Sequence, residues 1–413
     1  MKITMQSFIK SRNGKFLTHY KKTYHMKTST TSLALSLLIC LLVTDVSAQN
    51  RPEDVKLKQE LQIVIDSLWK ANGFPGLTLS VVLPDNRQMS LSTGFADTSN
   101  AVAMQPTHRM LSGSNGKSLF IAAALVLSSQ KYYTLDDRIE NYLSDEPWFH
   151  RLPNAETITM RMLMDHTSGL EEYYELGNFM ALVKENPSRT FTPIETLAYI
   201  FDRDPLFAAG TDWGYADTNF ILLGYILEKI SGKTMYSLVE QLIVDPYNLN
   251  ATQPSISRNL STLAIGHSRK GSPFPFEGEM VKNGLLVFNP QFEWMGGGFV
   301  SNVNDLTKWA KQLYTYKKMD ANLLAEMKVK VPAKTGKNHG YGLGIQIRPS
   351  TNFGESYGHS GWFPGYLTDA VYFPDKDIAM AIQFNTDDLS HLKMAPYDYI
   401  LMLTEKVATH LQK

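Results

Sequence analysis

The chain has 413 residues, of which 43% are hydrophobic and 19% are charged, a composition that is typical of a folded globular protein and excludes a disordered one. Forty basic residues balance forty acidic residues, so no overall charge draws the protein to nucleic acid or to an anionic membrane. We therefore expect a small-molecule or peptide partner and no nucleic-acid partner.

The N-terminal segment has the pattern of an export signal. Its apolar run, Leu33 to Val43, has eleven residues, which is too short to cross a bilayer at roughly 20 residues per helix. Val46-Ser47-Ala48 then places small residues where a signal peptidase reads them. We predict that residues 1–48 are an export signal, with Met26 as an alternative start of translation, and that no transmembrane anchor remains after cleavage. A buried apolar helix is the alternative explanation of the run.

The only cysteine, Cys40, lies inside this segment. The mature chain would then contain no disulfide, no thiol nucleophile and no metal bound by cysteine. Because exported proteins without disulfides are found in bacteria, we expect a periplasmic or secreted bacterial protein.

Strands are predicted at both ends of the chain, with helices between them. Residues 52–72 have apolar side chains at helical spacing, and residues 76–95 form two alternating runs split at 84–86, which predicts a β-hairpin. The later segments that are rich in β-forming residues are 341–347, 365–374 and 377–385. Helical patterns lie at residues 117–130, 159–164, 193–202, 218–231, 234–244 and 396–412.

This order of elements predicts an α+β fold, because strands from the two ends of a chain can join one sheet while the intervening helices pack apart from it. We expect a mixed or antiparallel sheet built from both chain ends and flanked by helices. An all-helical lobe would be inserted at about residues 135–290, within a single domain of residues 49–413.

The stretch SGSNGKS, residues 112–118, allows two interpretations. Its end matches a phosphate-binding loop, G-x-x-x-x-G-K-[ST], but Gly113 stands only three residues before Gly116, so the loop is too tight. From Ser114 to Lys117, a hydroxyl and an amine share one helix face, where the amine can hydrogen-bond the hydroxyl. That is a nucleophile beside its base. A serine that caps a helix near a solvated lysine is the commoner explanation of such spacing alone.

Two further motifs follow in order along the chain. Tyr215-Ala216-Asp217 comes about a hundred residues later, and His359-Ser360-Gly361 stands before the predicted strand pair of residues 365–385. With these motifs the chain resembles the serine β-lactamase and penicillin-binding protein superfamily, in its class C β-lactamase, D-alanyl carboxypeptidase and esterase branch. The segments ITMRMLMDHTSGL, GGGFVSNVNDLTKW and YGLGI extend the resemblance over roughly residues 55–385.

The third motif of this superfamily is often Lys-Thr-Gly, and Lys334-Thr335-Gly336 matches it literally. That tripeptide precedes YGLGI, however, whereas the superfamily places the motif after it. We therefore assign the motif to His359-Ser360-Gly361 and predict a surface turn at residues 334–336.

The resemblance implies an acyl-enzyme mechanism. Ser114 would attack a carbonyl, and Lys117 would accept its proton, for which the lysine must first be neutral although an unperturbed lysine is almost fully charged at pH 7. Tyr215 would share the proton relay and protonate the leaving group. The backbone N–H groups of Ser114 and Trp362 would bind the oxyanion, and the Trp362 ring either lines the acyl pocket or is a plain core aromatic.

The remaining motif residues imply substrate contacts and two departures from the superfamily. Asp217, Ser360, Gly361 and Trp362 are expected to contact substrate. His359, counted with the catalytic residues, replaces a lysine that would hold a substrate carboxylate, and histidine is mostly neutral at pH 7. Asp217 replaces an asparagine, and its carboxylate would favour the charged form of Lys117. Either Asp217 points elsewhere or another group compensates.

Other candidate residues have structural explanations. His166 is expected to hold a loop through hydrogen bonds. Residues 171–174 are expected in a loop at the rim of the site, where solvation is the favoured environment and substrate contact is the alternative. No spacing such as H-E-x-x-H indicates a metal, so we predict no cofactor and no metal.

We therefore predict an exported serine hydrolase that cleaves an ester, amide or peptide bond through an acyl-enzyme on Ser114. An esterase or a D-amino-acid peptidase or carboxypeptidase is favoured, and its substrate could derive from the cell wall. A β-lactamase is the alternative within this class. A non-catalytic protein of the same fold that binds peptidoglycan or a partner is an alternative of another class. A nucleotide-binding protein is a third class, and only the tripeptide GKS indicates it.

Overall fold

The computed structural model describes residues 51–412 except 273, 316–318 and 351. The chain divides into two compact units, Met1–Val55 and Lys56–Lys413, and only residues 51–55 of the first unit are described. The predicted export signal, with Cys40, lies outside the described residues. Within the described part of the chain, no helix combines the length and the apolar character that a membrane crossing requires.

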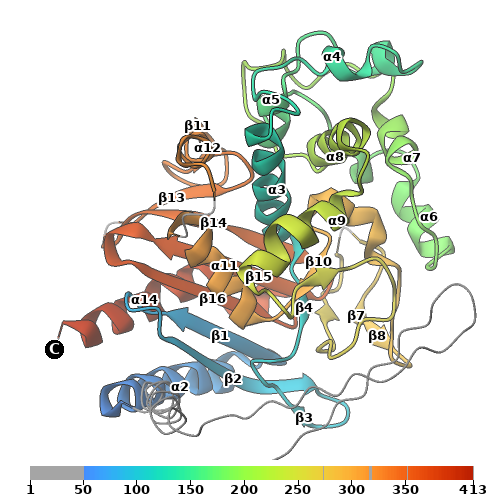
Figure 1. Ribbon diagram of the computed structural model, residues 1–413. Coiled ribbons are helices and arrows are strands. Elements are labelled where there is room, and N and C mark those ends of the chain that lie inside the picture. The colour runs from blue at the N-terminus through green and yellow to red at the C-terminus, as the bar shows by residue number, and fades with distance from the viewer. Residues whose placement is uncertain (1–50, 273, 316–318, 351, 413) are drawn as a thin grey trace, which may run out of the picture. The chain divides into compact units, whose positions relative to one another are not determined.

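The second unit is built on a nine-stranded antiparallel sheet (Figure 1). Its strands, in spatial order, are β11 (Val331–Pro332), β12 (Gly340–Tyr341), β13 (Gln346–Ser350), β14 (Gly354–Phe363), β15 (Tyr366–Phe373), β16 (Ile378–Phe384), β1 (Gly76–Val82), β2 (Gln88–Asp97) and β3 (Val102–Ala103). β1 pairs with its hairpin partner β2 on one side and with β16 on the other, where Leu77 lies opposite Phe384. The predicted sheet from both chain ends is confirmed.

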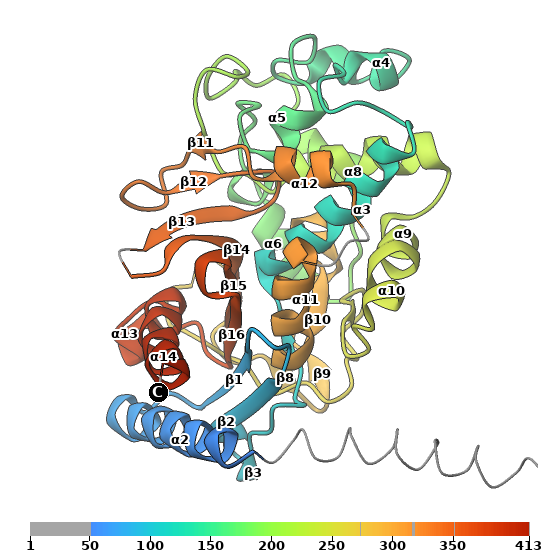
Figure 2. The same cartoon turned by 60° about the vertical axis from the view of Figure 1, so that its left-hand side comes forward.

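The two faces of strand β16 carry side chains of different size. Met380 and Ile382 pack with α2 (Pro52–Asn72) and α14 (Pro396–Leu411), whereas Ala379 and Ala381 pack with α11 (Val303–Thr315). Small side chains let α11 lie close to the sheet, and each large side chain buried on the other face contributes roughly 1.5–3 kcal/mol. Figures 1 and 2 show α2 and α14 side by side on one face. The short helix α13 (Leu389–Leu392) precedes α14.

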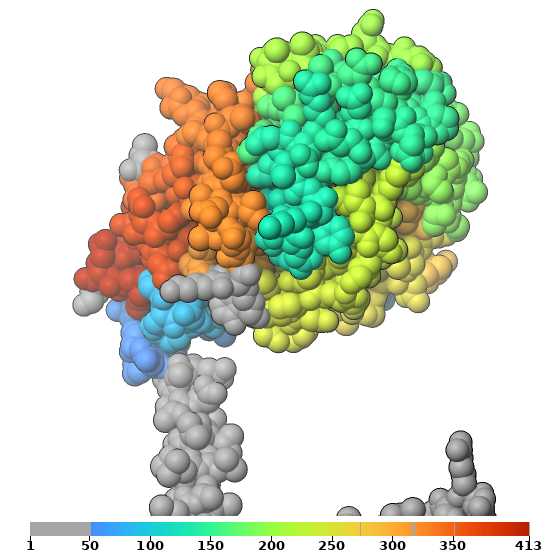
Figure 3. Space-filling view, turned by 45° about the horizontal axis from the view of Figure 1, so that its top comes forward, coloured from blue at the N-terminus to red at the C-terminus, as the bar shows by residue number. Residues whose placement is uncertain are grey.

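A helical part follows the buried helix α3 (Lys117–Ser129). Its helices are α4 (Glu140–Leu143), η3 (Phe149–Arg151), α5 (Met160–Met164), η4 (Tyr173–Glu175), α6 (Phe179–Glu185), α7 (Pro193–Leu197), η5 (Ala198–Ile200), α8 (Thr218–Ser231), α9 (Met235–Val239), the π-helix η6 (Glu240–Val244) and α10 (Asp245–Tyr247). In the space-filling view, these residues, teal to yellow-green, border the orange residues of the C-terminal part of the chain (Figure 3).

Short strands, rather than helices, occupy the end of the predicted lobe. They are β5 (Gln253–Pro254), β6 (His267–Ser268), β7 (Gly278–Glu279), β8 (Val281–Lys282) and β9 (Leu285–Leu286). The helices therefore end at Tyr247 and not near residue 290. The segment that returns the chain to the sheet comprises the 3-10 helix η7 (Pro290–Gly296) and β10 (Phe299–Ser301), and the latter pairs with β4 (Met110–Leu111) and β5.

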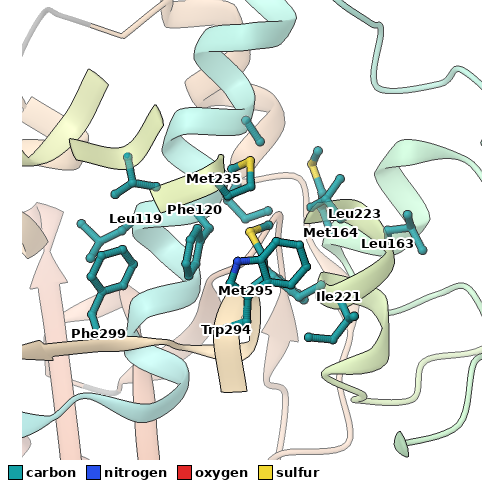
Figure 4. Close-up of a cluster of buried hydrophobic side chains, with 14 of the residues drawn as sticks. Leu119, Phe120, Leu163, Met164, Ile221, Leu223, Met235, Trp294, Met295 and Phe299 are labelled. Atoms are coloured by element: carbon teal, nitrogen blue, oxygen red, sulfur yellow. The ribbon is translucent and has the colours of Figure 1, made fainter. Parts of the chain in front are cut away.

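The core of the helical part forms around α3. Leu119 and Phe120 of α3 point toward Met235 of α9, Met295 of η7 and Phe299 of β10 (Figure 4). Ala and Leu on nearly every face of α3 explain why it is buried all round. This packing holds the first turn of α3, and with it Lys117, in one position.

Two predicted strand boundaries were wrong. Residues 341–347 are not one strand, because Gly344 has φ +65° and any Cβ there would overlap Ile121 of α3. The strand β14, which carries the third motif, was not predicted, because its sequence is rich in glycine and polar residues. Two short elements remain. The helix α12 (Ala321–Met327) precedes β11, and the 3-10 turn η8 (Pro374–Lys376) connects β15 to β16.

Candidate active site

The turn that carries Ser114 is pressed against strand β14. Ser114 lies in the 3-10 helix η2 (Gly113–Gly116), directly before α3. Gly113 has φ +53°, and a Cβ there would lie 2.5 Å from the Trp362 carbonyl oxygen; a Cβ on Gly361 would overlap the Ser112 carbonyl. Only glycine, which has no Cβ, fits at these two positions. The backbone of Ser114 is thereby placed beside that of Trp362.

Lys117 is fully buried and has three hydrogen-bond acceptors. Its Nζ donates to Ser114 Oγ at 2.9 Å, to Asp217 Oδ1 at 2.5 Å and to the Gly296 carbonyl. An ammonium group has three donors and no acceptor, so this arrangement satisfies the charged amine completely. The sequence-predicted contact between the hydroxyl and the amine is present.

Asp217 points at Lys117, which excludes the alternative that it points elsewhere. It stands at the start of α8 and is 8% exposed. Its backbone N–H donates to Glu172 Oε2 at 2.6 Å, and a Cβ on Gly296 would lie 2.8 Å from its Oδ2. The absence of a side chain at Gly296 makes room for the carboxylate.

Tyr215 lies next to the nucleophile and is protonated at neutral pH. Burial raises its pKa well above the ordinary value, the charge of Asp217 adds to this, and the hydroxyl of Ser114 opposes it. Among the described residues, its buried hydroxyl has no hydrogen-bond partner of good geometry. Its ring also lies 5.0 Å from Lys117 Nζ. The phenol can therefore give a proton but cannot act as a preformed base.

His359 is buried, and both of its ring nitrogens are engaged within the protein. Tyr341 OH lies 2.8 Å from Nε2, and Nδ1 contacts the Ser360 carbonyl. Because a carbonyl only accepts, Nδ1 carries the proton and Nε2 accepts from Tyr341. Burial, together with the charge of Lys117, lowers the pKa of His359 to about 3. The ring is neutral at pH 7 and supplies no fixed positive charge.

Gln346 orients Ser360 and was missed from the sequence. Its Oε1 accepts from the Ser360 backbone N–H at 3.1 Å, and its Nε2 lies 3.0 Å from Ser360 Oγ. Gln346 stands in β13, beside β14 in the sheet. A glutamine inside a short strand has no motif around it, so only strand pairing could have indicated this role.

These residues meet at a pocket of about 280 Å³. Aromatic side chains line much of it: Tyr173, Tyr174, Phe274, Phe292, Trp362 and Phe363. The Trp362 ring lies 5.2 Å from that of Phe274, so it belongs to the pocket wall rather than to a separate core. Among the described residues that line the pocket, none is a lysine or an arginine.

The favoured solvated environment of residues 171–174 is found only in part, and the alternative of a place in the site applies to the tyrosines. Glu171 pairs with Arg203 at the surface. Tyr173 is fully buried and lines the pocket, and its hydroxyl donates to the Phe292 carbonyl at 3.1 Å. Residues 334–336 form a turn between β11 and β12, as predicted. Even so, Thr335 of that turn reaches the pocket.

His166 holds a loop, as expected. Its Nδ1 accepts from the Ala216 backbone N–H at 3.3 Å and lies 3.2 Å from the Asn219 amide nitrogen. The ring packs on Tyr215 with centroids 4.2 Å apart. His166 therefore positions the segment that carries Tyr215 and Asp217. Lys117 and Ser118 are buried in α3, so GKS does not form a phosphate-binding loop.

Known proteins resemble this chain in sequence. The beta-lactamase family profile matches residues 61–401. A D-aminopeptidase of Brucella anthropi is 24% identical over 313 residues, 75% of this chain and 56% of that protein. A penicillin-binding protein of Bacillus subtilis is 23% identical over 326 residues, 77% of this chain and 69% of that protein. The chain thus spans little more than half of the D-aminopeptidase it matches.

Solved structures share the fold. A D-stereospecific amidohydrolase from Streptomyces sp. has a TM-score of 0.69 at 25% identity, covering 83% of this chain and 97% of that one. A D-amino acid amidase from Ochrobactrum anthropi has a TM-score of 0.71 at 22% identity, covering 86% and 99%. The chain belongs to the beta-lactamase family of serine hydrolases, as the resemblance of its motifs indicated.

Proposed function

We propose that this chain is an exported bacterial serine hydrolase that cleaves an amide, peptide or ester bond through an acyl-enzyme on Ser114. D-amino-acid amides and peptides are the favoured substrates. One observation carries the proposal: Lys117 Nζ lies 2.9 Å from Ser114 Oγ at a pocket, which is the arrangement of a nucleophile and its base.

The proposed steps use the residues that the structure brings together. Ser114 Oγ attacks the carbonyl while its proton passes to Lys117, and the backbone N–H groups of Ser114 and Trp362 receive the oxyanion. Tyr215, which is protonated, gives its proton to the leaving group, and the proton held by Lys117 replaces it. Water then attacks the acyl-enzyme, and one of its protons passes through Lys117 to Ser114 Oγ as the acid is released. His359 holds Tyr341 and the Ser360 backbone in place.

Lys117 must lose a proton before it can accept one. Its three contacts match the three donors of an ammonium group, and the carboxylate of Asp217 stabilises that charge. In this proposal only the fraction of molecules in which Lys117 is neutral begins the reaction. Activity should therefore rise with pH.

The charge of the pocket limits the kinds of substrate that the site can bind. With His359 neutral and no lysine or arginine among the described pocket residues, the site has no fixed cation for a substrate carboxylate. This favours an amidase, aminopeptidase or esterase over a carboxypeptidase or an efficient β-lactamase. The names of the D-aminopeptidase relative and of the D-stereospecific amidohydrolase structure support the same choice.

The test is hydrolysis of a small activated ester and of D- and L-phenylalanine amide by residues 49–413. The wild type is compared with Ser114→Ala and with Ser129→Ala, an exposed serine at the other end of α3. We expect activity in the wild type and in Ser129→Ala, and at least a 1,000-fold loss in Ser114→Ala. Equal activity in all three proteins would mean that Ser114 is not the nucleophile, and inactivity in all three would favour a binding protein.

A further inference from the structure

Glu293 is a buried acidic residue at the pocket that the proposed mechanism does not use. It lies in η7, is 5% exposed and lines the pocket. Its Oε2 is buried and has no hydrogen-bond partner among the described residues. A buried polar group without a partner costs free energy, so such a group in a pocket calls for a ligand or another explanation.

No side chain in the described part of the chain forms an ion pair with this carboxyl. The nearby cation, Lys117, already binds Asp217 at 2.5 Å. Burial raises the pKa of Glu293 well above its ordinary value, the charge of Asp217 raises it further, and Lys117 opposes both. The partly buried Glu172 has a pKa raised by the same two causes, and its Oε1 is also without a partner. The site therefore holds more carboxyl groups than positive charges.

The backbone holds Glu293 beside the nucleophile. A Cβ on Gly297 would overlap both the Glu293 carboxyl and the Gly113 carbonyl, so the two groups face each other across a glycine. Gly113 directly precedes Ser114. The next residue, Trp294, has φ 38° and ψ −116°, which is strained for a bulky side chain. Strain of this kind persists only where the surrounding structure enforces it, and it is frequent at binding sites.

We propose that Glu293 binds a cationic amino group of the substrate next to the scissile carbonyl, so that the enzyme acts on acyl groups with a free α-ammonium. An ammonium supplies both the positive charge and the N–H donors that the Glu293 carboxyl lacks, and the carboxyl gives up to solvent the proton that burial favours when the ammonium binds. The aromatic wall, with Phe274 and Phe292, would hold the rest of the acyl group. This inference rests on the proposed function, because it names the substrate of the same site.

The first test compares two substrates that differ only in the amino group. They are the p-nitroanilides of D-phenylalanine and of 3-phenylpropanoic acid, and the readout is the ratio of their kcat/KM values. We expect the wild type to prefer the amine and Glu293→Gln to lower the ratio at least tenfold. In the control Glu228→Gln, which changes a half-buried carboxyl bonded to the Met235 backbone N–H, the ratio should equal that of the wild type. An unchanged ratio in Glu293→Gln, or a wild-type preference for the des-amino substrate, would overturn the proposal.

The second test does not require turnover. Calorimetry measures binding of 2-phenylethylamine and of its neutral analogue 2-phenylethanol to the wild type, to Glu293→Gln and to Glu293→Asp. We expect the amine to bind the wild type at least tenfold more tightly than the alcohol, and this preference to vanish in Glu293→Gln and to persist in part in Glu293→Asp. Equal binding of both compounds to the wild type would refute the role of Glu293. Amine-selective binding without any hydrolysis would refute only the proposed function.

Discussion

The ion pair of Lys117 and Asp217 favours a charged amine beside the nucleophile Ser114. Ser114, Lys117 and Tyr215 could be predicted because each stands in a short local motif whose spacing carries the chemistry. The contact of Asp217 with Lys117, at 2.5 Å, could not be predicted, because the direction of a side chain at the start of a helix depends on packing that a single sequence does not show. Glu293 was missed for the same reason, since nothing along the chain distinguishes it from a solvated glutamate.

The Asp217→Asn variant tests whether this carboxylate opposes activation. The amide keeps the shape of the side chain but removes the negative charge that stabilises the ammonium of Lys117. We expect the rising limb of kcat/KM against pH to move to lower pH. The profile is measured from pH 5 to 10 beside Asp202→Asn, which changes a surface ion pair. A limb that stays in place or moves to higher pH would contradict the role given to Asp217.

Elements with strong periodicity were predicted well, and elements defined by their neighbours were not. The helix over residues 52–72, the hairpin split at 84–86 and the strand β16 follow their own apolar pattern. β14 is a strand because it is paired on both sides, with β13 and β15, although three of its ten residues are glycine. The close contact of β14 with η2 requires Gly361, where a Cβ would overlap the Ser112 carbonyl, and propensity scales read a strand so rich in glycine as a loop.

The contact between η2 and β14 is tested by Gly113→Ala. An alanine there meets both an unfavourable φ and the Trp362 carbonyl oxygen at 2.5 Å, so the nucleophile turn must shift. We expect kcat/KM to fall at least 100-fold and the unfolding temperature to fall.

Gly232→Ala is the matched control for this change. Gly232 also has a left-handed φ, +67°, but nothing lies within 4 Å of a Cβ there. The Gly232→Ala substitution should lower the free energy of unfolding only by the backbone strain of roughly 1–2 kcal/mol and leave kcat/KM near the wild-type value. Equal losses of activity in the two variants would show that the contact with β14 does not position Ser114.

At the scale of the whole molecule, the sheet from both chain ends could be predicted, because strands at the two ends of a single domain have few other partners. The extent of the helical lobe could not be predicted, since the two-residue strands between residues 253 and 286 are too short to show the alternation of apolar and polar residues that marks a strand. The pocket could not be predicted either. It is assembled from η4, η7, β13, β14 and the loop at Phe274, which are far apart in the sequence.

The buried carboxyl of Glu293 links the stability of the whole fold to pH. Its pKa is raised by burial and by Asp217, so the folded state holds a proton that the unfolded state loses above about pH 4.3. Stability therefore falls as pH rises above that value, by about 1.4 kcal/mol for each unit by which the pKa is raised. The Glu293→Gln variant lacks this dependence.

Thermal unfolding of the wild type and of Glu293→Gln at pH 5 and pH 8 measures this linkage. We expect the variant to gain stability relative to the wild type between the two pH values. Glu228→Gln should gain less, because the Met235 N–H bonded to Glu228 opposes the effect of burial on its pKa. A difference between variant and wild type that is the same at both pH values would show that Glu293 ionises normally in the fold.

The central claim is that Ser114 carries the acyl group, and the most direct measurement is the mass of the protein during turnover. The wild type and Ser114→Ala are mixed with an activated ester, quenched in acid and analysed as intact protein and as peptides. The account predicts a wild type heavier by one acyl group, located on the peptide that contains Ser114, and no adduct in Ser114→Ala. An adduct on another residue, or steady hydrolysis by the wild type with equal activity in Ser114→Ala, would contradict it.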